Sequence, residues 1–442
     1  MRVGPRGRRI NSFQIIITGF LLVILLGTFL LMMPFSSQSG VVTPFFDALF
    51  TSTSAVCVTG LVVFDTATYW SYFGQAVILM LIQIGGMGVV TVAVAFAVIS
   101  GRNISLMQRS TMQEAISAPK VGGIVRLTNF IIKITFLIEL SGALIMAPVF
   151  CRDYGMKGIW MAVFHSISAF CNAGFDLMGV RSPFSSLTGY VTSPVINVVV
   201  ILLIVIGGIG FLTWDDFRRS KFRLRKYKMQ SKVVLFTTIF LITIPALYFF
   251  FFEFNDLAPA ERVFSSIFQA VTPRTAGFNT ADLTSMSEPG IGIMILLMLI
   301  GGSPGSTAGG MKVTTIAVLL ATAVATFRKK EETHVFGRAI DNSACKDAAT
   351  ILMMYLALFF TGGIVISIIE KLPLITCLFE TASAVGTVGL TLGITTSLGL
   401  VSRLILIILM FLGRVGGLTL IFAVADTKKM TSRLPHEKIT VG

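Results

Sequence analysis

Four short segments of this 442-residue chain share a pattern that suits the binding of a cation by backbone oxygens. When Gly60, Gly174, Gly277 and Gly389 are placed in register, each follows a run of small and polar residues and precedes Leu or Phe. Glycine lets a loop turn its carbonyl oxygens inward, where they can replace the hydration shell of an ion. The segments are FTSTSAVCVTGL (Phe50 to Leu61), FHSISAFCNAGF (Phe164 to Phe175), IFQAVTPRTAGF (Ile267 to Phe278) and FETASAVGTVGL (Phe379 to Leu390).

Hydrolytic chemistry has one formal motif, because Gly301, Ser303 and Gly305 satisfy the G-x-S-x-G expression. That motif needs a strand-to-helix elbow, which is implausible inside an apolar span, and His165 is expected on the opposite side of the membrane. The sequence therefore predicts that the protein is not an enzyme.

Metal and disulfide chemistry have little support. The cysteines show no C-x-x-C spacing and the histidines are few and scattered, so neither a zinc site, a disulfide framework nor an organic cofactor is expected. These residues are Cys57, Cys151, Cys171, Cys345, Cys377, His165, His334 and His436.

The composition is that of a polytopic membrane protein, with 54% hydrophobic and 13% charged residues. A helix needs roughly 20 apolar residues to cross a bilayer. The basic start leads directly into a full-length apolar span, so no cleavable signal peptide is expected. Windows that approach or exceed the required length are Ser12 to Met33, Gln75 to Ser100, Val191 to Trp214, Met294 to Ile300 with its flanks, and Leu404 to Ala425.

The net charge of +14 reflects topology rather than binding of nucleic acid. Basic residues gather in segments that alternate with the spans, as the positive-inside rule expects of cytoplasmic loops, so both termini are predicted to be cytoplasmic. A second role of the block from 218 to 232, contact with anionic lipids or with an acidic partner, stays open. The basic segments are Arg2 to Arg9, Asp215 to Lys232, Phe327 to Arg338 and the tail after Ala425.

A stretch of about a dozen residues, too short to span a bilayer, precedes each glycine segment. Pro44, Pro259 and Pro373 stand near three of the expected starts, with Asp47 and Glu261 in or near the first turn, and both features mark helix N-termini. These stretches are interpreted as re-entrant half-helices. Their C-terminal ends carry partial negative charge and would favour a cation near the membrane centre.

The sequence thus predicts an all-α polytopic membrane protein with four tandem units of span, half-helix, loop and span around a pseudo-fourfold pore. This gives eight transmembrane helices and four re-entrant pore helices, because irregular backbone at membrane depth must line a cavity or be buried in protein. A coupled transporter of small solutes is an alternative, although such proteins usually show two inverted repeats and membrane-embedded acids. The expected units cover residues 1–105, 106–225, 226–335 and 336–442.

The motifs VTGL, NAGF, TAGF and TVGL, with FQAVTPRTAGFN from Phe268 to Asn279, resemble the Trk/Ktr/HKT superfamily of potassium transporters. Within it, the chain length is similar to the Ktr membrane subunits of the KtrB or KtrD type. The resemblance implies potassium uptake through a filter shorter and less selective than that of a potassium channel. Sodium or mixed transport is the alternative, although four glycines resemble potassium-selective members. The implied filter residues are Val58, Thr59, Gly60, Asn172, Ala173, Gly174, Thr275, Ala276, Gly277, Thr387, Val388 and Gly389.

The segment GGSPGSTAGGMK interrupts an apolar stretch that runs from about Pro289 to Phe327, and its glycines, proline and hydroxyl residues make a poor helix interior. Close helix packing is one interpretation. The family resemblance implies the other, a gating loop beneath the filter, and a loop of this composition can hinge. The implied gate residues are Gly301, Gly302, Ser303, Pro304, Gly305, Ser306, Thr307, Ala308, Gly309, Gly310 and Lys312.

Arg414 falls within the last span, where a central arginine costs about 3 kcal/mol on insertion scales. One interpretation is a partner for an acid or for helix-end carbonyls. The other, implied by the resemblance, is a cationic barrier near the conduction path, which adds Arg414 to the gate. The motifs IGGMG, IGGIG and VGGLT, which begin at Ile84, Ile206 and Val415, are explained by close packing.

The resemblance also implies partners and location. It implies a homodimer in the cell membrane, in contact with membrane lipids and seated on a cytosolic ring of nucleotide-binding regulatory subunits of the KtrA/KtrC type. The transported ion would be potassium, with sodium as a stimulating or second ion. Nothing in this chain resembles a nucleotide-binding unit, so nucleotide sensing would belong to the ring.

Overall fold

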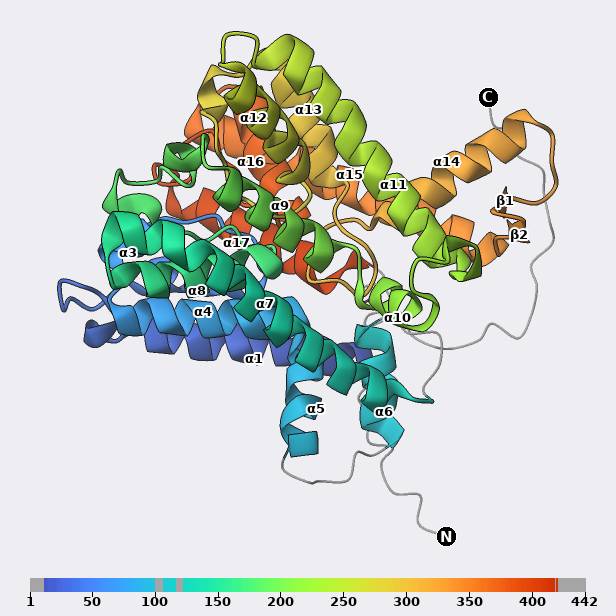
Figure 1. Ribbon diagram of the computed structural model, residues 1–442, viewed down its shortest axis with the longest axis horizontal. Helices are drawn as coiled ribbons and strands as arrows, with labels where there is room; N and C mark the ends of the chain where they lie inside the picture. Colours follow the sequence, from blue (N-terminus) through green and yellow to red (C-terminus); the bar gives the residue numbers. More distant parts are fainter. Residues whose placement is uncertain (1–11, 100–105, 117–121, 418, 420–442) are drawn as a thin grey trace.

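The computed structural model describes residues 12–99, 106–116, 122–417 and 419, and this part of the chain is mostly helical. The basic residues Arg2 to Arg9, the tail after Ala425 and His436, all noted above, lie outside the described residues. Four long helices pack with shorter ones between them (Figure 1). Among the described residues, four helices are long and apolar enough to cross a membrane, or five if a bent pair counts as one span. The long helices are α1 (Ser12–Met32), α7 (Ile124–Tyr154), α11 (Met229–Tyr248), which continues through a π-helical turn to Glu253, and α15 (Asn342–Glu370).

A short helix follows each long one, at the places where half-helices are expected. Pro44 and Pro373 cap two of them and Pro259 begins a third, while Asp47 and Glu261 lie in first turns. Each ends directly before one of the glycine loops, and its last turns are buried. The short helices are α2 (Phe45–Val56), α8 (Lys157–Phe170), α12 (Pro259–Val271) and α16 (Leu374–Gly386).

The apolar helices that follow the loops are shorter than expected. The windows Gln75 to Ser100 and Val191 to Trp214 were expected as single spans, but they break at Gly88 and Gly210, and the helix that begins at Leu400 ends before Gly416. These glycines have φ of 85°, 89° and 85°, a conformation that ends a right-handed helix. The resulting helices are α4 (Tyr72–Met87), α5 (Val89–Ile99), α9 (Pro194–Gly208), α10 (Phe211–Ser220), α13 (Glu288–Leu299), α14 (Val313–Phe327) and α17 (Leu400–Val415).

The glycine-rich motifs at these breaks also allow the close packing expected of them. A Cβ at Gly86 would lie 2.6 Å from the Cys171 sulfur, and one at Gly207 would lie 2.8 Å from the Thr307 hydroxyl oxygen. The close-packing interpretation was therefore incomplete, because the same motifs also end helices. At Gly210 the chain turns so sharply that α10 runs at 95° to α9.

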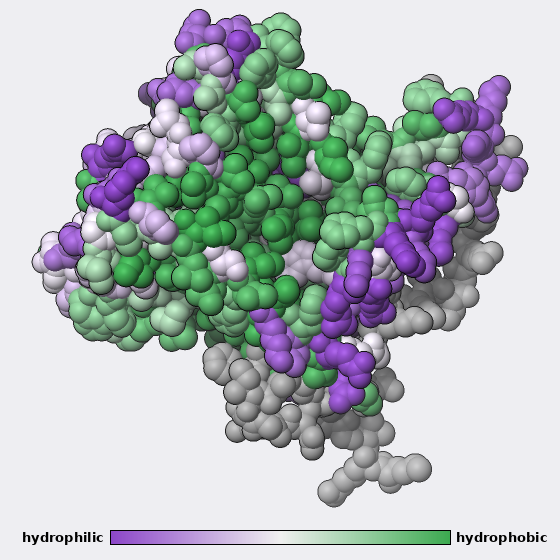
Figure 2. Space-filling model, in the orientation of Figure 1, coloured by the Kyte–Doolittle hydropathy of each residue, from purple (hydrophilic) through white to green (hydrophobic). Residues whose placement is uncertain are grey.

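The remaining elements lie at the two ends of the helices. Figure 2 shows a broad hydrophobic face with hydrophilic residues gathered at either end of it, as expected for a protein that crosses a membrane. A two-stranded antiparallel hairpin, β1 (His334–Val335) and β2 (Arg338–Ala339), is an exception to the all-helical expectation. The small helices are α3 (Thr66–Tyr69) and α6 (Leu106–Ala115).

Candidate functional site

The four glycines of the repeated segments meet in a closed ring. A Cβ added at Gly60 would lie 3.1 Å from the Cα of Gly174, and one at Gly174 would lie 2.9 Å from the Cα of Gly277. The corresponding distances are 3.4 Å from Gly277 to Gly389 and 2.8 Å from Gly389 back to Gly60. Even a methyl group therefore fits nowhere in the ring without displacing backbone.

Carbonyl oxygens line the same ring. The added Cβ atoms would contact the carbonyl oxygens of the residues that precede the next glycine around the ring, namely Thr59, Ala173, Ala276 and Val388. These residues and the residue before each of them are fully buried. The structure thus brings together all the residues named above as filter residues, although they come from four distant parts of the sequence.

A second regularity lies two residues before each glycine. Val58, Asn172, Thr275 and Thr387 have φ of 50°, 57°, 72° and 52°, and the glycines that follow also have positive φ. Positive φ is uncommon for any residue with a Cβ and is unfavourable for β-branched valine and threonine. Strain of this kind persists only where the surrounding structure imposes it, and it concentrates at functional sites.

The loop N–H groups are bound to the ends of the short helices. Serine carbonyls accept hydrogen bonds of 2.8 Å from Thr59, Ala173 and Val388. The hydroxyls of Ser54 and Ser383 accept from Gly60 at 3.1 Å and from Gly389 at 3.0 Å. Because the loop N–H groups donate to the short helices, the loop carbonyl oxygens can face the centre of the ring and bind an ion there. This arrangement suits a cation, and it explains the polar residues in the repeated segments.

A cavity of about 220 Å³ opens on one side of the ring. All four glycines line it, together with Asp65, Asp176 and Asp282. Burial raises the pKa of Asp176 to about 7, the Asp65 carboxylate adds to the rise, and a hydrogen bond from the Met178 N–H opposes it. Three carboxylates at the entrance to a ring of carbonyls give this cavity a negative potential that concentrates cations.

On another side of the ring lies the loop between α13 and α14, which has the interruption expected from the sequence. A Cβ at Gly309 would lie 3.0 Å from Cβ of Thr387, and one at Gly310 would lie 3.3 Å from Cα of Gly386. The loop also binds α9 through Ser303 N–H to Gly208 O at 3.0 Å. It therefore lies between the end of α9 and the fourth glycine loop.

Two cations hold this loop from opposite sides. Lys312 donates to the carbonyl oxygens of Ala308 and Gly309 at 2.8 and 3.2 Å. Arg414 donates to the carbonyl of Thr307 in the loop and to those of Gly85 and Gly86 at the end of α4. The first interpretation of Arg414 included carbonyl partners at a helix end, and the structure contains such partners at the end of α4.

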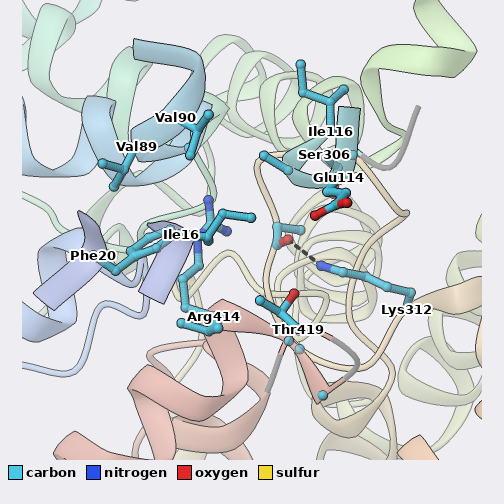
Figure 3. A pocket seen from close by; sticks show the side chains of 18 of the residues that line it. Ile16, Phe20, Val89, Val90, Glu114, Ile116, Ser306, Lys312, Arg414 and Thr419 are labelled. Atoms are coloured by element: carbon cyan, nitrogen blue, oxygen red, sulfur yellow. Dashed lines mark hydrogen bonds between the residues drawn. The ribbon is translucent and has the colours of Figure 1, made fainter. Parts of the chain in front are cut away.

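The same two cations line a second cavity of about 200 Å³ beyond the loop. Figure 3 shows Arg414 and Lys312 reaching into it from opposite sides, and Glu114 also lines it. Arg414 therefore both clips the loop to α4 and places positive charge on the cavity wall. The two interpretations are compatible in this geometry.

Buried carboxylates are features that the sequence reasoning missed. Glu380 in α16 accepts from the Thr391 hydroxyl at 2.7 Å and from that of Thr395, which fixes the chain just after Gly389. Glu139 in α7 is 4% exposed and accepts from the Gln83 side-chain amide at 3.2 Å. Glu380 could have been noticed as the only acid within the four quoted segments.

The geometry gives no support to hydrolysis. His165 is fully buried, with Nδ1 2.7 Å from the Met161 carbonyl, and Nε2 accepts from the Leu177 N–H at 3.3 Å. Backbone groups thus engage both ring nitrogens. Within the described ranges, no group of three or more His, Cys, Asp and Glu side chains is placed to hold a metal ion.

Comparison with known proteins agrees with this geometry. The family model described as TrkH, cation transport protein, matches residues 7–433. The chain belongs to this TrkH family. Its members transport cations, so this TrkH-family chain is a multi-pass membrane protein of a transporter family and not of an enzyme family.

Two curated relatives and one solved structure show how far the similarity extends. The TrkH-family chain is 40% identical to the potassium/sodium uptake protein NtpJ of Enterococcus hirae, over 98% of each chain. It is 39% identical to the Ktr system potassium uptake protein B of Bacillus subtilis, over 98% of this chain and 97% of that protein. The crystal structure of the potassium transporter TrkH from Vibrio parahaemolyticus superposes with a TM-score of 0.75 at 20% identity, covering 97% of this chain and 87% of that one. The last comparison supports the fold.

Proposed function

We propose that this protein is the ion-translocating subunit of a potassium uptake system. The proposal follows from membership of a cation transporter family and from near full-length similarity to proteins named for potassium uptake. One observation carries it further: four loops share positive φ two residues before a glycine, and their carbonyls converge on one ring. Rings of backbone carbonyls are how cation filters replace water around an ion.

In this proposal the four units of long helix, short helix, loop and apolar helix surround a single pore. The glycines and the two residues before each of them form the selectivity filter. Potassium enters from the cavity lined by Asp65, Asp176 and Asp282, which therefore faces the outside of the cell. The cell membrane is the site of uptake, and the basic segments and both termini lie in the cytoplasm.

The loop from Gly301 to Lys312 is the proposed gate. It lies against Gly386 and Thr387 at the fourth filter loop, and its backbone is held by hydrogen bonds to α9, α10 and α17 and by Arg414. A loop held in this way can move without unfolding a helix. Conduction requires it to withdraw from beneath the ring.

The proposal includes partners. Similarity to proteins named as parts of a Ktr system supports further subunits. The family resemblance implies a homodimer bound to a cytosolic nucleotide-binding regulatory ring, with stimulation by sodium. The part of this chain that would contact the ring is the cytoplasmic end of the helices, next to the proposed gate. Nucleotide binding to the ring would then bias the position of the loop.

Mixed transport of potassium and sodium is the second candidate. It is favoured by the 40% identity to a relative named for uptake of both ions. A filter with one ring of glycines offers fewer binding sites than a long channel filter, and fewer sites discriminate less between ions.

Uptake by cells that lack their own potassium transporters tests both candidates. Cells that express this chain, with and without a regulatory ring, are depleted of potassium. Potassium or sodium is then added to the medium, and net uptake of the added ion is measured. We expect potassium uptake that excess sodium inhibits only weakly and that the ring increases. Equal uptake of both ions would favour the second candidate, and no uptake of either by inserted protein would contradict both.

A further inference from the structure

A basic pocket lies away from the proposed pore, between the start of α7, α10 and the start of α11. Its volume is about 400 Å³, and its lining includes four cationic side chains and one carboxylate, Asp215. Figure 2 shows hydrophilic residues gathered over α10, at the edge of the hydrophobic face. The cationic residues of this pocket are Arg126, Arg218, Arg219 and Lys228.

Buried carboxylates fix the pocket wall. Asp215 is 4% exposed and pairs with Arg219 at 2.7 Å and with Arg218 at 3.4 Å. Asp216 accepts from the Lys228 N–H at 3.1 Å and from the Ser231 hydroxyl at 2.7 Å, which joins α10 to the start of α11. The cations therefore stand at defined positions and are not a loose surface cluster.

Positive charge remains uncompensated inside the pocket. Among the described residues, the Arg126 guanidinium forms no hydrogen bond or ion pair, and Arg218 lies 4.6 Å from the centre of the Phe130 ring of α7. Asp215 pairs with Arg218 and Arg219. Asp216 lies 3.7 Å from Lys228 Nζ, so two carboxylates balance four cations. The pocket thus retains a net positive charge that a small anion can neutralise.

The start of α7 adds backbone donors to the same pocket. Gly122 and Gly123 line it, and a Cβ on either would meet no atom within 4 Å, so a ligand can approach the backbone there. No side chain caps the helix at Gly123. Free N–H groups at a helix start, beside several cations, form a recognised arrangement for binding phosphate groups.

The surroundings show which molecule carries the phosphate. The helix α10 runs at 95° to α9, so it lies along the membrane surface if α9 crosses the membrane. Phe217, Phe222 and Leu224 are 49%, 86% and 58% exposed beside the cationic residues. Exposed apolar side chains interleaved with cations are typical of a helix at the lipid interface, and basic pockets between helix ends bind lipid headgroups.

We propose that this pocket binds the headgroup phosphate of an anionic phospholipid in the cytoplasmic leaflet. The phosphate accepts hydrogen bonds from Arg126 and from the start of α7, and Lys228 and Arg219 supply further charge. The acyl chains lie against Phe217 and Phe222. The proposal does not depend on which cation the protein transports.

The test uses the full chain purified in a neutral detergent, with melting temperature as the readout. Dioleoylphosphatidylglycerol should raise the melting temperature in a saturable way, and dioleoylphosphatidylcholine should do so much less. In Arg126→Gln the apparent affinity for the anionic lipid should fall on the order of fivefold, since each cation near the surface contributes about that factor. Arg126→Gln combined with Lys228→Gln should lower it further.

The matched control is Lys329→Gln with Lys330→Gln, which removes two exposed cations after the end of α14, outside the pocket. This control should keep the lipid response. Because Arg126 is exposed, Arg126→Gln should leave the melting temperature without lipid unchanged.

Three outcomes would overturn the proposal. An unchanged lipid response in the pocket variants would place any lipid elsewhere. An equal response to sodium phosphate alone would assign the pocket to a free anion. Saturable stabilisation by a poly-glutamate peptide but not by the lipid would assign it to an acidic protein segment.

Discussion

Arg403 at the start of α17 binds Asp47 at the start of α2, with 2.7 Å between Nη1 and Oδ1. The two residues are 356 positions apart, and their side chains are only 20% and 16% exposed. Arg403 also donates to the Thr396 carbonyl at 3.0 Å. This pair joins α17, near the end of the described chain, to α2, near its start.

We expect Arg403→Gln to destabilise the protein, because the Asp47 charge is left partly buried without its partner. The expected loss is about 2 kcal/mol, between the values typical of exposed and buried pairs. A double-mutant cycle with Asp47→Asn, followed by thermal unfolding, isolates the coupling. Arg152→Gln, which breaks a pair whose arginine is 76% exposed, is the control and should have little effect. Equal losses of stability in Arg403→Gln and Arg152→Gln would argue against a role of the Arg403–Asp47 pair in joining α17 to α2.

Gly60→Ser should reduce the preference for potassium over sodium on the order of tenfold, equivalent to about 1.4 kcal/mol. Gly60 has φ of 94°, and a Cβ there would lie 2.6 Å from the Ala173 carbonyl oxygen. Competition of sodium with potassium uptake measures the change. Gly40→Ser is the control, because Gly40 also has positive φ but a Cβ there meets nothing within 4 Å. Unchanged competition in Gly60→Ser and in matching variants at the other three glycines would contradict the filter.

Deletion of Ser303 to Ala308 should raise potassium flux severalfold and weaken its dependence on the regulatory ring, because the segment lies beneath the proposed filter. Flux per inserted protein in proteoliposomes measures both effects. Deletion of Phe336 and Gly337, the turn of the β1–β2 hairpin, is a control for shortening the chain. Unchanged flux in inserted protein would favour a packing role for the loop.

Arg414→Gln removes donors to three carbonyls that clip the loop to α4. We expect faster flux together with a stability loss of about 1–3 kcal/mol, because the carbonyls are left without partners. Arg414→Lys separates the two roles, since it keeps the charge but loses the planar fork. If the positive charge alone limits flux, the lysine variant will conduct like the unmodified protein. If the hydrogen bonds between the loop and α4 limit flux, the lysine variant will conduct like Arg414→Gln.

Potassium uptake should depend on external pH through Asp176, whose pKa burial raises to about 7. Below that pH the carboxyl is protonated and neutral, so the entrance cavity loses a negative charge and the apparent affinity for potassium falls. In Asp176→Asn the apparent affinity for potassium should be low at all pH values and should not change between pH 6 and 8. Asp282→Asn, in the same cavity, should lower the affinity but keep the pH dependence. A pH response that survives in Asp176→Asn would assign it to another group.

The sequence was sufficient for features that depend on local chemistry. The loop at Gly301 to Lys312 was predictable, because glycines, proline and hydroxyl residues cannot sustain a helix. Prolines marked the starts of three of the four short helices, whereas α8 has neither a proline nor an acid in its first turn. The glycines of the four loops came from internal repetition alone.

Features imposed by distant contacts were not predictable in the same way. Nothing local indicates positive φ at Val58 or Thr387, because β-branched residues avoid it and only the surrounding protein imposes it. The ends of helices at Gly88 and Gly210 were missed because glycine pairs also suit close packing. Arg403 pairs with Asp47 and Arg414 donates to Gly85, each more than 300 positions away, beyond any sequence pattern.

The ring of glycines is built from one continuous chain, and this has a consequence for how selectivity can change. In a pore assembled from identical subunits, one gene mutation alters every quarter of the ring at once. Here Gly60, Gly174, Gly277 and Gly389 are separate codons, so a mutation alters one quarter and leaves three intact. In the proposed filter, ion preference can therefore shift in small inherited steps, and the four quarters are free to diverge from one another.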